Sequence, residues 1–580
     1  MRRLVGYLRP YWRQVVVALA AIIGSAAGQL AQPYLTKVAI DRYITAGNLG
    51  GLKGIAALYL IILVSSFALD YLQTYTMQMT GQRIVFDLRM ALFEHLQRLD
   101  LRTYDRNPVG RLMTRVTTDV DVLNDLFTSG VVAIFGDVFT LAGIMIVMLS
   151  LNWRLALVTF SVLPLIVLVT QWFRRNVRES YRTVRTLIAR INAFLQENIT
   201  GMATVQLFRR EALNFSRFDV IDRQHRDANV ASIFYYAVFY PAVEVVGALA
   251  ASLIIWYGGG EALKGTLTLG ALVAFLQYAQ RFFRPISDIS DKFNTLQSAM
   301  ASSERIFKLL DTPVVIERPA LPAARPAGAR GHIVFDRVWF AYNDEDYVLR
   351  DVSFEAAPGE RVGVVGATGA GKSTIINLLL RFYDVSRGRI LVDGVDIRHL
   401  DPAELRALCG LVLQDVHLFS GTIATNVRLG NAAIDDAAVR RAVEAVHAWP
   451  FVERLPQGLD SPVAERGSTL SVGQKQLLSF ARALAFDPRI LILDEATSSV
   501  DTETEILIHD ALRVLMAGRT TIAIAHRLST IQDMDKILVL HKGQVRESGT
   551  HQELLAARGI YYKLFQLQYK DSPQAAAETR

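Results

Sequence analysis

Val362-Gly-Val-Val-Gly366-Ala-Thr-Gly-Ala-Gly-Lys-Ser373 decides the fold of the second half of this chain. An apolar segment typical of a buried strand runs into a glycine-rich turn of the form G-x-x-x-x-G-K-S, and the apolar residues of a helix follow. Glycines let successive backbone N–H groups converge on phosphate oxygens at a helix N-terminus. The predicted phosphate-binding residues are Gly366, Ala367, Thr368, Gly369, Ala370, Gly371, Lys372, Ser373 and Thr374.

Within this loop, Lys372 supplies positive charge to the phosphates and the Ser373 hydroxyl is a ligand for Mg²⁺. A second apolar run, Ile490 to Leu493, ends in Asp494 and Glu495 and is typical of a buried parallel strand that carries both acids to the carboxyl edge of a sheet. Asp494 is suited to hold Mg²⁺, and Glu495 to polarise an attacking water as general base. An acidic strand end is common by itself, but behind a phosphate loop it indicates ATP hydrolysis.

The composition of the 580 residues changes sharply partway along, which predicts at least two units of different kinds. The apolar fraction of 51% and the mean hydropathy of +0.26 average a membrane half and a soluble half. Most arginines behind the net charge of +7 flank apolar runs, which favours a membrane protein over a nucleic-acid-binding protein. Cys409 is the only cysteine, which excludes an intrachain disulfide.

Six apolar stretches approach the length of about 20 residues that spans a bilayer. They are about Val15 to Ala39, Ile55 to Tyr75, Val131 to Leu151, Leu155 to Phe173, Ile233 to Tyr257 and Leu269 to Phe283. The sixth is the shortest and contains Gln277 and Gln280. We expect the first stretch to be retained as an anchor, because the N-terminus lacks a cleavable signal pattern.

Arginines gather before the first stretch and in the long connections after the second and the fourth, which places both chain ends in the cytoplasm. Each long connection is poor in Gly and Pro and predicts a hairpin of two ~25-residue helices that projects about 35 Å as a stalk. The breakers Asn107-Pro-Val-Gly110 mark the first tip, and Leu207 to Glu211 is the contact element that we expect at the second.

Prolines between 313 and 326 mark a linker, after which strand-like segments such as Ile333 to Phe340 alternate with helical segments such as Ser373 to Phe382. The fold class we expect is therefore an α-helical six-span transmembrane domain fused to an α/β P-loop NTPase. The expected boundaries are 1–311 for the membrane domain, 312–330 for the linker, 331–570 for the α/β domain and 571–580 for a disordered tail.

With Leu470-Ser-Val-Gly-Gln474 added to these motifs, nearly the whole chain resembles the ATP-binding cassette (ABC) superfamily. In that family the signature binds the γ-phosphate of ATP held by the opposite cassette, a role that falls here to Ser471, Gly473 and Gln474. The resemblance further implies roles for four more residues: adenine stacking by Tyr342, sensing of Mg²⁺ and water by Gln414, communication across the dimer by Asp501 and a γ-phosphate contact by His526.

The resemblance and the motifs together predict a catalytic set of Glu495, His526, Lys372 and Gln414, and a Mg²⁺ set of Ser373, Gln414 and Asp494. Taken singly, Tyr342 is equally an ordinary strand aromatic, Gln414 a surface amide and His526 a core histidine. Their joint occurrence in the family order favours the functional interpretation.

The segments Gln414-Asp-Val-His-Leu-Phe419 and Glu465-Arg-Gly467 are similar to exporter cassettes, as is the fusion of spans ahead of the cassette. Tyr104 to Arg111 and Val205 to Glu211 resemble the stalk tips that dock on exporter cassettes. The resemblance implies a half-transporter that pairs with a second half-transporter chain, in a homodimer or heterodimer. We expect ATP-driven export or flipping of a hydrophobic or amphipathic substrate, such as a drug or lipid, by alternating access across the cytoplasmic membrane.

Two departures from the family pattern leave an alternative open. The third signature residue is Val472 where Gly is usual, and Ser498-Ser-Val-Asp501 replaces the commoner Ser-Ala-Leu-Asp. Such variants resemble one member of heterodimeric exporters with an impaired composite ATP site, and harmless drift explains them equally well. The alternative function is a regulatory subunit that clasps ATP with little turnover.

Two carboxylates fall inside the apolar stretches: Asp137 in the third, and Glu244 one turn after Pro241 in the fifth. A carboxylate in hydrocarbon costs several kcal/mol unless it faces a cavity or a partner, so each is a candidate for a substrate or proton role, with structural pairing as the alternative. We expect Pro241 to kink its helix. The identity of the substrate stays open.

Overall fold

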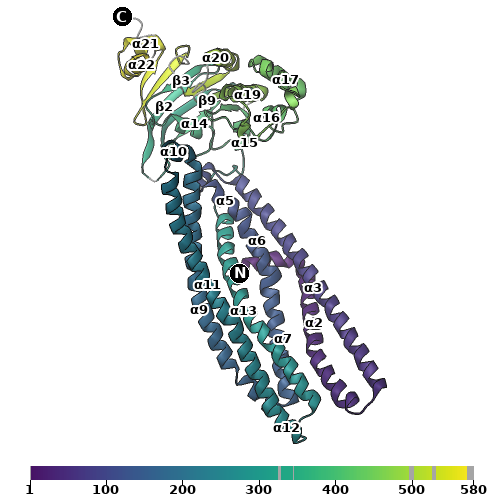
Figure 1. The fold of residues 1–580 in the computed structure, drawn as a ribbon. Coiled ribbons are helices and arrows are strands. Elements are labelled where there is room, and N and C mark those ends of the chain that lie inside the picture. Colours follow the sequence, from purple (N-terminus) through teal and green to yellow (C-terminus); the bar gives the residue numbers. More distant parts are fainter. Residues whose placement is uncertain (1, 324–327, 344, 495–501, 525–530, 571–580) are drawn as a thin grey trace. The chain divides into compact units, whose positions relative to one another are not determined.

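The structure is a computed structural model, which describes residues 2–323, 328–343, 345–494, 502–524 and 531–570 (Figure 1). The chain forms two compact units. The first consists of Met1–Gln97 and Val109–Thr312, and the second of Arg98–Pro108 and Pro313–Arg580. The short segment at the predicted first stalk tip therefore belongs to the unit that contains the phosphate loop.

The described part of the first unit is helical. Its principal helices are α1 (Arg2–Leu8), α2 (Trp12–Val38), α3 (Leu49–Arg98), α5 (Val109–Val116), α6 (Thr118–Asp125), α7 (Val132–Leu151), α8 (Trp153–Phe160), α9 (Leu163–Thr200), α10 (Met202–Leu207), α11 (Glu211–Leu253), α12 (Gly259–Leu263) and α13 (Leu269–Leu310). A 3₁₀ turn, η1 (Arg9–Tyr11), follows α1, and the π-helical turns η2 (Ala39–Ile44), η3 (Leu126–Val131) and η4 (Ile254–Gly258) adjoin α2, α7 and α11.

Within the described residues, five helical segments are long and apolar enough to cross a membrane. They are Gly6–Ile44, Leu49–Arg98, Ile134–Leu151, Trp153–Thr200 and Glu211–Leu263. The expected sixth span forms the first part of the continuous helix α13. Amide and guanidinium side chains at Gln277, Gln280 and Arg281 make that helix too polar to be counted with the others, so the number of six is not confirmed.

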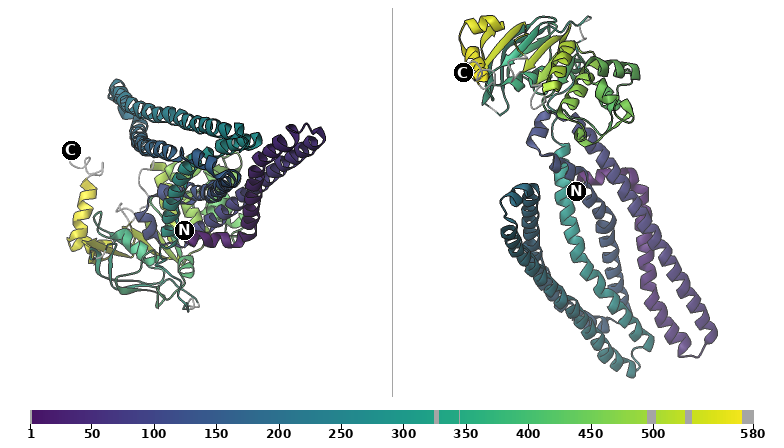
Figure 2. Two further views of the ribbon diagram at one scale, coloured as in Figure 1. Left: turned by 90° about the horizontal axis from the view of Figure 1, so that it is seen from below. Right: turned by 45° about the horizontal axis from the view of Figure 1, so that its top comes forward.

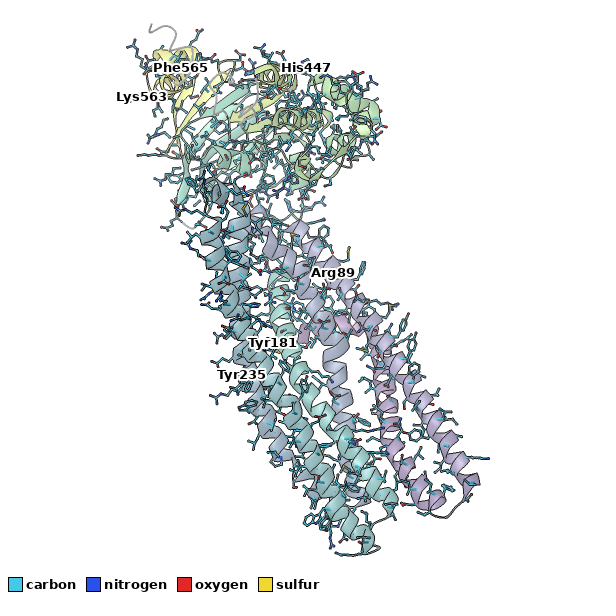
Figure 3. All side chains as sticks on the ribbon, in the orientation of Figure 1. Arg89, Tyr181, Tyr235, His447, Lys563 and Phe565 are labelled. Carbon is cyan, nitrogen blue, oxygen red and sulfur yellow. The ribbon has the colours of Figure 1, made fainter. Side chains whose placement is uncertain are left out.

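The long connections are helical, as predicted, because the spanning helices simply continue beyond the apolar segments. Helix α3 runs unbroken for 50 residues, and α9 and α11 lie side by side for most of their length (Figure 2). Stacked rings of Phe173 and Phe239, 4.0 Å between centroids, join α9 to α11. Tyr181 of α9 and Tyr235 of α11, both labelled in Figure 3, belong to the same pair of helices. Short helices close both tips: α4 (Leu101–Arg106) and α10.

Hydrogen bonds join both ends of helix α13 to carboxylates of neighbouring helices. At its start, Asp41 of η2 accepts hydrogen bonds from the Gly270 N–H (2.8 Å) and the Thr268 hydroxyl (2.6 Å). Toward its end, the buried Asp119 of α6 accepts from the Ser302 hydroxyl (2.9 Å) and from Arg305. A carboxylate at a helix N-terminus satisfies orphan N–H groups and complements the helix dipole.

The carboxylates inside the apolar stretches have different surroundings. Asp137 of α7 forms an ion pair with Lys292 of α13. This ion pair favours structural pairing of Asp137, with Lys292 as the partner. Glu244 is exposed, and none of the described residues forms a hydrogen bond or ion pair with it. Helix α11 continues through Pro241.

The second unit holds two main sheets. A four-stranded antiparallel sheet has the order β2-β1-β4-β5, and a six-stranded sheet has the order β12-β11-β3-β10-β9-β6. The strands of these sheets are β1 (Ile333–Ala341), β2 (Tyr347–Ala356), β3 (Arg361–Val365), β4 (Arg387–Val392), β5 (Val395–Asp396), β6 (Cys409–Val412), β9 (Ile490–Asp494), β10 (Thr520–Ile524), β11 (Lys536–His541) and β12 (Gln544–Gly549). The third sheet pairs β7 (Gly421–Thr422) with β8 (Pro462–Val463).

Helices of the second unit divide between two hydrophobic cores. Their bounds are α14 (Lys372–Leu379), α15 (Pro402–Ala407), α16 (Ile423–Arg428), α17 (Asp436–Ala445), α18 (Trp449–Val452), α19 (Val472–Ala485), α20 (Thr502–Met516), α21 (His551–Ala556) and α22 (Ile560–Lys570). Buried residues of α14 and α15 pack with the antiparallel sheet in one core. Those of α16, α17, α19 and α20 build the other core. The α/β fold predicted for this region is thus present, and α16, α17, α18 and α19 lie between β6 and β9 in the chain.

Candidate nucleotide-binding site

One edge of the six-stranded sheet gathers most of the predicted chemistry. Strands β3, β10, β9 and β6 are adjacent and parallel, with Val364 opposite Ile524, Ile524 opposite Asp494, and Val412 opposite Leu493. Because parallel strands end at the same edge, the loop after Val365, the carboxylate of Asp494 and Gln414, two residues beyond β6, converge there. Glu495, Asp501 and His526 lie outside the described residues.

The phosphate loop has the backbone that its glycines predict. Gly369 and Gly371 adopt φ values of +80° and +101°, a region that side-chain-bearing residues rarely occupy. A Cβ atom on Gly366 would lie 2.2 Å from the carbonyl oxygen of Leu540, and one on Gly369 would meet nothing within 4 Å. The loop is therefore both tightly seated on the sheet and open where a phosphate would approach, which fits a nucleotide.

Lys372, at the start of α14, is 6% exposed and folds over this loop. Its ammonium donates hydrogen bonds to the carbonyl oxygens of Gly366 (2.8 Å) and Ala367 (3.2 Å). These carbonyl oxygens hold the ammonium at the loop, where a phosphate would accept stronger, charge-assisted hydrogen bonds. Ser373 is exposed beside it, whereas Thr374 is buried.

Tyr342, the expected adenine-stacking residue, lies against the first turns of the same helix. Its hydroxyl donates to the Thr374 hydroxyl (3.2 Å) and accepts from the Asn377 amide (3.3 Å). Its ring packs edge-on against Tyr383, with 5.1 Å between centroids. Residues 342 and 374, well separated in sequence, are therefore brought together at the phosphate loop.

The stalk-tip helix α4 bonds directly to this corner of the site. Arg102 donates to the carbonyl oxygen of Tyr342 (3.1 Å), and Arg106 donates to the side chain of Asn343 (2.9 Å). The hydroxyl of Tyr383 donates to the carboxylate of Asp105. Burial, together with the Asp105 carboxylate, raises the pKa of the Tyr383 hydroxyl, so that it stays a donor. Sequence reasoning predicted docking of this tip but did not identify Tyr383.

The signature residues begin a helix in the other core. Ser471 is the N-cap of α19: its hydroxyl accepts from the Gln474 N–H (3.2 Å), and the Gln474 side chain accepts from the Ser471 N–H (3.0 Å). Gly473 is buried, whereas Val472 is 51% exposed. Within the described residues no hydrogen bond joins Ser471 or Gln474 to the phosphate loop.

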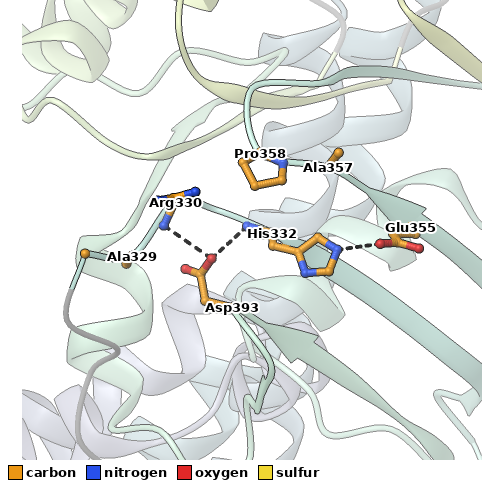
Figure 4. A pocket seen from close by; sticks show the side chains of 8 residues that line it. Ala329, Arg330, His332, Glu355, Ala357, Pro358 and Asp393 are labelled. Carbon is orange, nitrogen blue, oxygen red and sulfur yellow. Dashed lines mark hydrogen bonds and ion pairs between the residues drawn. The ribbon is translucent and has the colours of Figure 1, made fainter.

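A hollow elsewhere in this unit is lined by other residues (Figure 4). Its wall includes His332, which forms a 2.6 Å contact with Glu355, and Asp393, which accepts hydrogen bonds from the backbone N–H groups of residues 330 to 332. None of the predicted nucleotide-binding residues lines it. The hollow belongs to the junction between the linker and β1.

Comparisons with known proteins agree along the whole chain. Residues 15–286 match the family described as ABC transporter transmembrane region, and residues 349–498 match the family described as ABC transporter. A probable multidrug resistance ABC transporter ATP-binding/permease protein of Bacillus subtilis is 40% identical, over 89% of this chain and 77% of its own length. An ATP-dependent lipid A-core flippase of Syntrophus aciditrophicus is 36% identical, over 98% of this chain and 94% of its own.

Among solved structures, that of a bacterial Atm1-family ABC exporter with ATP bound is similar, with a TM-score of 0.78 and 32% identity. The match covers 97% of this chain and 98% of that one. Sequence and fold therefore point to the same family across both units.

Proposed function

The chain belongs to the ABC transporter superfamily as an ATP-hydrolysing half-transporter of the exporter type, and from this premise we propose that it exports or flips a hydrophobic or amphipathic substrate by alternating access. The relatives of lipid and multidrug type support a drug-like or lipid substrate. The expected location is the cytoplasmic membrane, with both chain ends and the cassette in the cytoplasm.

The observation that carries the proposal is the shared sheet edge, where Lys372, Asp494 and Gln414 converge. In this arrangement Lys372 binds the β- and γ-phosphates, and Tyr342 stacks on the adenine. Mg²⁺ would be held by Ser373, Gln414 and Asp494 and would polarise the phosphoryl oxygens. Glu495 accepts a proton from the attacking water, and His526 contacts the γ-phosphate.

A complete site needs a second half-transporter. Ser471 and Gly473 belong to a helix of the other core, so we propose that they reach the γ-phosphate bound by the partner cassette. Both a homodimer and a heterodimer satisfy this requirement. Closure of two cassettes around nucleotide would pull on α4 through Tyr342 and Asp105 and so change the access of the membrane helices.

Purified chain in lipid vesicles tests the proposal. Glu495→Gln should keep nucleotide affinity and lower ATP turnover by roughly 10² or more, because a positioned general base contributes that much. Lys372→Ala should weaken nucleotide binding itself, whereas Lys563→Ala on the exposed face of α22 should change neither property. Near-normal phosphate release by Glu495→Gln would exclude Glu495 as the general base. Substrate movement that does not depend on ATP would exclude the proposed function.

The exposed Val472 at the start of α19 favours a second candidate, a subunit that clasps ATP and sets the activity of a partner. Turnover of the chain alone in lipid separates the two candidates. Robust ATP hydrolysis supports a self-sufficient transporter. If the chain alone does not hydrolyse ATP, and both a second half-transporter chain and the substitution Val472→Gly restore hydrolysis, the result supports the regulatory subunit.

A further inference from the structure

Four polar side chains follow one face of the membrane-crossing helix α2. They are Ser25, Gln29, Gln32 and Thr36, spaced by four, three and four residues, as one side of an α-helix requires. Ser25 is 2% exposed and Gln32 is 9% exposed, whereas Gln29 between them is exposed, so neighbouring helices cover the stripe at two of its four positions. Polar groups placed there cost free energy unless they bond to one another or to a ligand.

The stripe connects two charged side chains of neighbouring helices. At one end, the Ser25 hydroxyl donates to the carboxylate of Asp70 in α3 (2.5 Å), and the Gln29 amide donates to the Ser25 hydroxyl (3.4 Å). At the other end, Arg281 of α13 donates to the Gln29 carbonyl oxygen (2.5 Å) and to the Gln32 side chain (2.7 Å). Two separate sets of hydrogen bonds therefore meet at Gln29, whose side chain bonds toward the Asp70 carboxylate and whose backbone carbonyl accepts from the Arg281 guanidinium.

Part of this arrangement is explained by Pro33, which lies inside α2. A proline has no N–H, so the carbonyl oxygen four residues earlier, that of Gln29, loses its helical donor. Arg281 supplies the missing hydrogen bond. A guanidinium carries more N–H groups than the two bonds to α2 use, and among the described residues no other acceptor bonds to those that remain.

The missing N–H of Pro33 explains why a donor bonds to the Gln29 carbonyl oxygen, but it does not explain why that donor carries a positive charge. Arg281 is twelve residues from the start of α13, and Gln32 is twelve residues from the end of η2, so both lie about 18 Å along their helices, a length shorter than the ~30 Å thickness of a hydrocarbon core. Arginine does not deprotonate in proteins. Among the described side chains, no carboxylate forms an ion pair with it.

We propose that Arg281 binds the anionic headgroup, a carboxylate or a phosphate, of an amphipathic substrate. The inference rests on the proposed function and narrows its substrate class. A guanidinium presents parallel N–H groups that match both headgroups in bidentate fashion, and a desolvated charge-assisted pair is stronger than either neutral bond to α2. Gln29 and Gln32 then act as positioning residues that hold the guanidinium in place.

The test measures equilibrium binding to the full-length transporter in phosphatidylcholine nanodiscs without nucleotide. The probes are a C18 carboxylate, a C18 alkyl phosphate, a C18 quaternary ammonium and inorganic phosphate. Wild type should bind both anionic amphiphiles more tightly than the ammonium. Excess inorganic phosphate should not displace them, because the chain as well as the headgroup is recognised. Equal binding of anion and cation, or displacement by free phosphate, would overturn the proposal.

Arg281→Gln keeps an N–H donor for the Gln29 carbonyl but removes the charge. It should weaken binding of the anionic amphiphiles roughly tenfold or more, since hydrogen bonds to charged groups are worth that factor, and leave the ammonium unaffected. Arg281→Lys should retain part of the anion affinity. An equal loss for anion and cation would mean that the arginine acts through the structure of α2 alone.

A double variant separates the two roles of Arg281. In Pro33→Ala the backbone N–H of residue 33 again serves the Gln29 carbonyl, so Arg281 is no longer required to fill that gap. Pro33→Ala/Arg281→Gln should therefore still bind anions weakly, and recovery of wild-type affinity would refute the headgroup site. Because binding is measured without ATP, it fails or succeeds independently of ATP-driven movement, which tests the proposed function.

Discussion

The hydrogen bond between Tyr383 and Asp105 offers the sharpest test of how nucleotide chemistry reaches the stalk. Tyr383 is 7% exposed, and its hydroxyl donates to the carboxylate of Asp105 in α4. Asp105→Ala removes the acceptor and leaves a buried hydroxyl without that partner. A hydrogen bond to a charged group contributes about 1.5–3 kcal/mol, and we take the lower end because Asp105 itself is exposed.

A loss of about 1.5 kcal/mol corresponds to a roughly tenfold weaker docking of α4 on the cassette. Amide hydrogen exchange of residues 101–106 should quicken by about that factor, while ATP affinity stays unchanged because Lys372 and its loop are untouched. In vesicles, the substrate moved per ATP hydrolysed should fall. Asp436→Ala, which removes an exposed carboxylate bonded to Arg428, is the matched control and should have no effect.

A double-mutant cycle decides whether the two groups act together. Tyr383→Phe should reproduce most of the effect of Asp105→Ala, and the double variant should add only a few tenths of a kcal/mol to either. Strict additivity of the two single changes, or a full transport ratio in Asp105→Ala, would refute the reasoning.

Three further predictions concern single groups. Burial alone raises the pKa of Asp119, but hydrogen bonds from Arg305 and Ser302 outweigh burial and lower the pKa in the folded protein. The ionised Asp119 therefore stabilises the fold at pH values above the unfolded pKa, near 3.8, and this stabilisation is lost as the pH falls below that value. Thermal unfolding of Asp119→Asn should accordingly show a smaller drop in this acid range than wild type. Although Cys409 as a residue is only partly buried, burial of its thiol raises the pKa to about 12, so maleimide at pH 7 should label it only after unfolding. Ser471→Asp should keep the cap of α19 and hence its melting temperature, yet abolish turnover by repelling the γ-phosphate, whereas Ser471→Ala should cost about 1 kcal/mol of stability.

Short-range patterns in the sequence predicted the elements that carry the proposed nucleotide-binding residues. The run Ile490 to Leu493 forms a fully buried parallel strand, β9, and Arg361 to Val365 forms β3, because continuous apolar residues fit a sheet covered on both faces. The helical stalks and the breaker at Asn107 also follow from local propensity. The roles of Glu495, Asp501 and His526 remain predictions, since these residues lie outside the described part of the chain.

Other features depend on contacts that no local pattern reveals. Tyr383 and Asp105 are 278 residues apart, and nothing in either neighbourhood marks them as partners. Hydropathy does not single out Asp70, because an average over an apolar window conceals a single charge. The sequence nevertheless carries one signal of the hydrogen bonds at α2, since the four-three-four spacing of its polar residues is typical of one face of a helix.

Nucleotide-driven pairing of the two cassettes is the central claim, and a distance between cassettes tests it most directly. Because the Cys409 thiol should be unreactive, a spin label on Val472→Cys would report the separation of the two signature helices in vesicles, provided that this variant still hydrolyses ATP. ATP and Mg²⁺ in the Glu495→Gln background should shorten that separation to a single narrow distribution, and nucleotide-free protein should show a longer one. An unchanged separation after addition of ATP and Mg²⁺ would contradict the account.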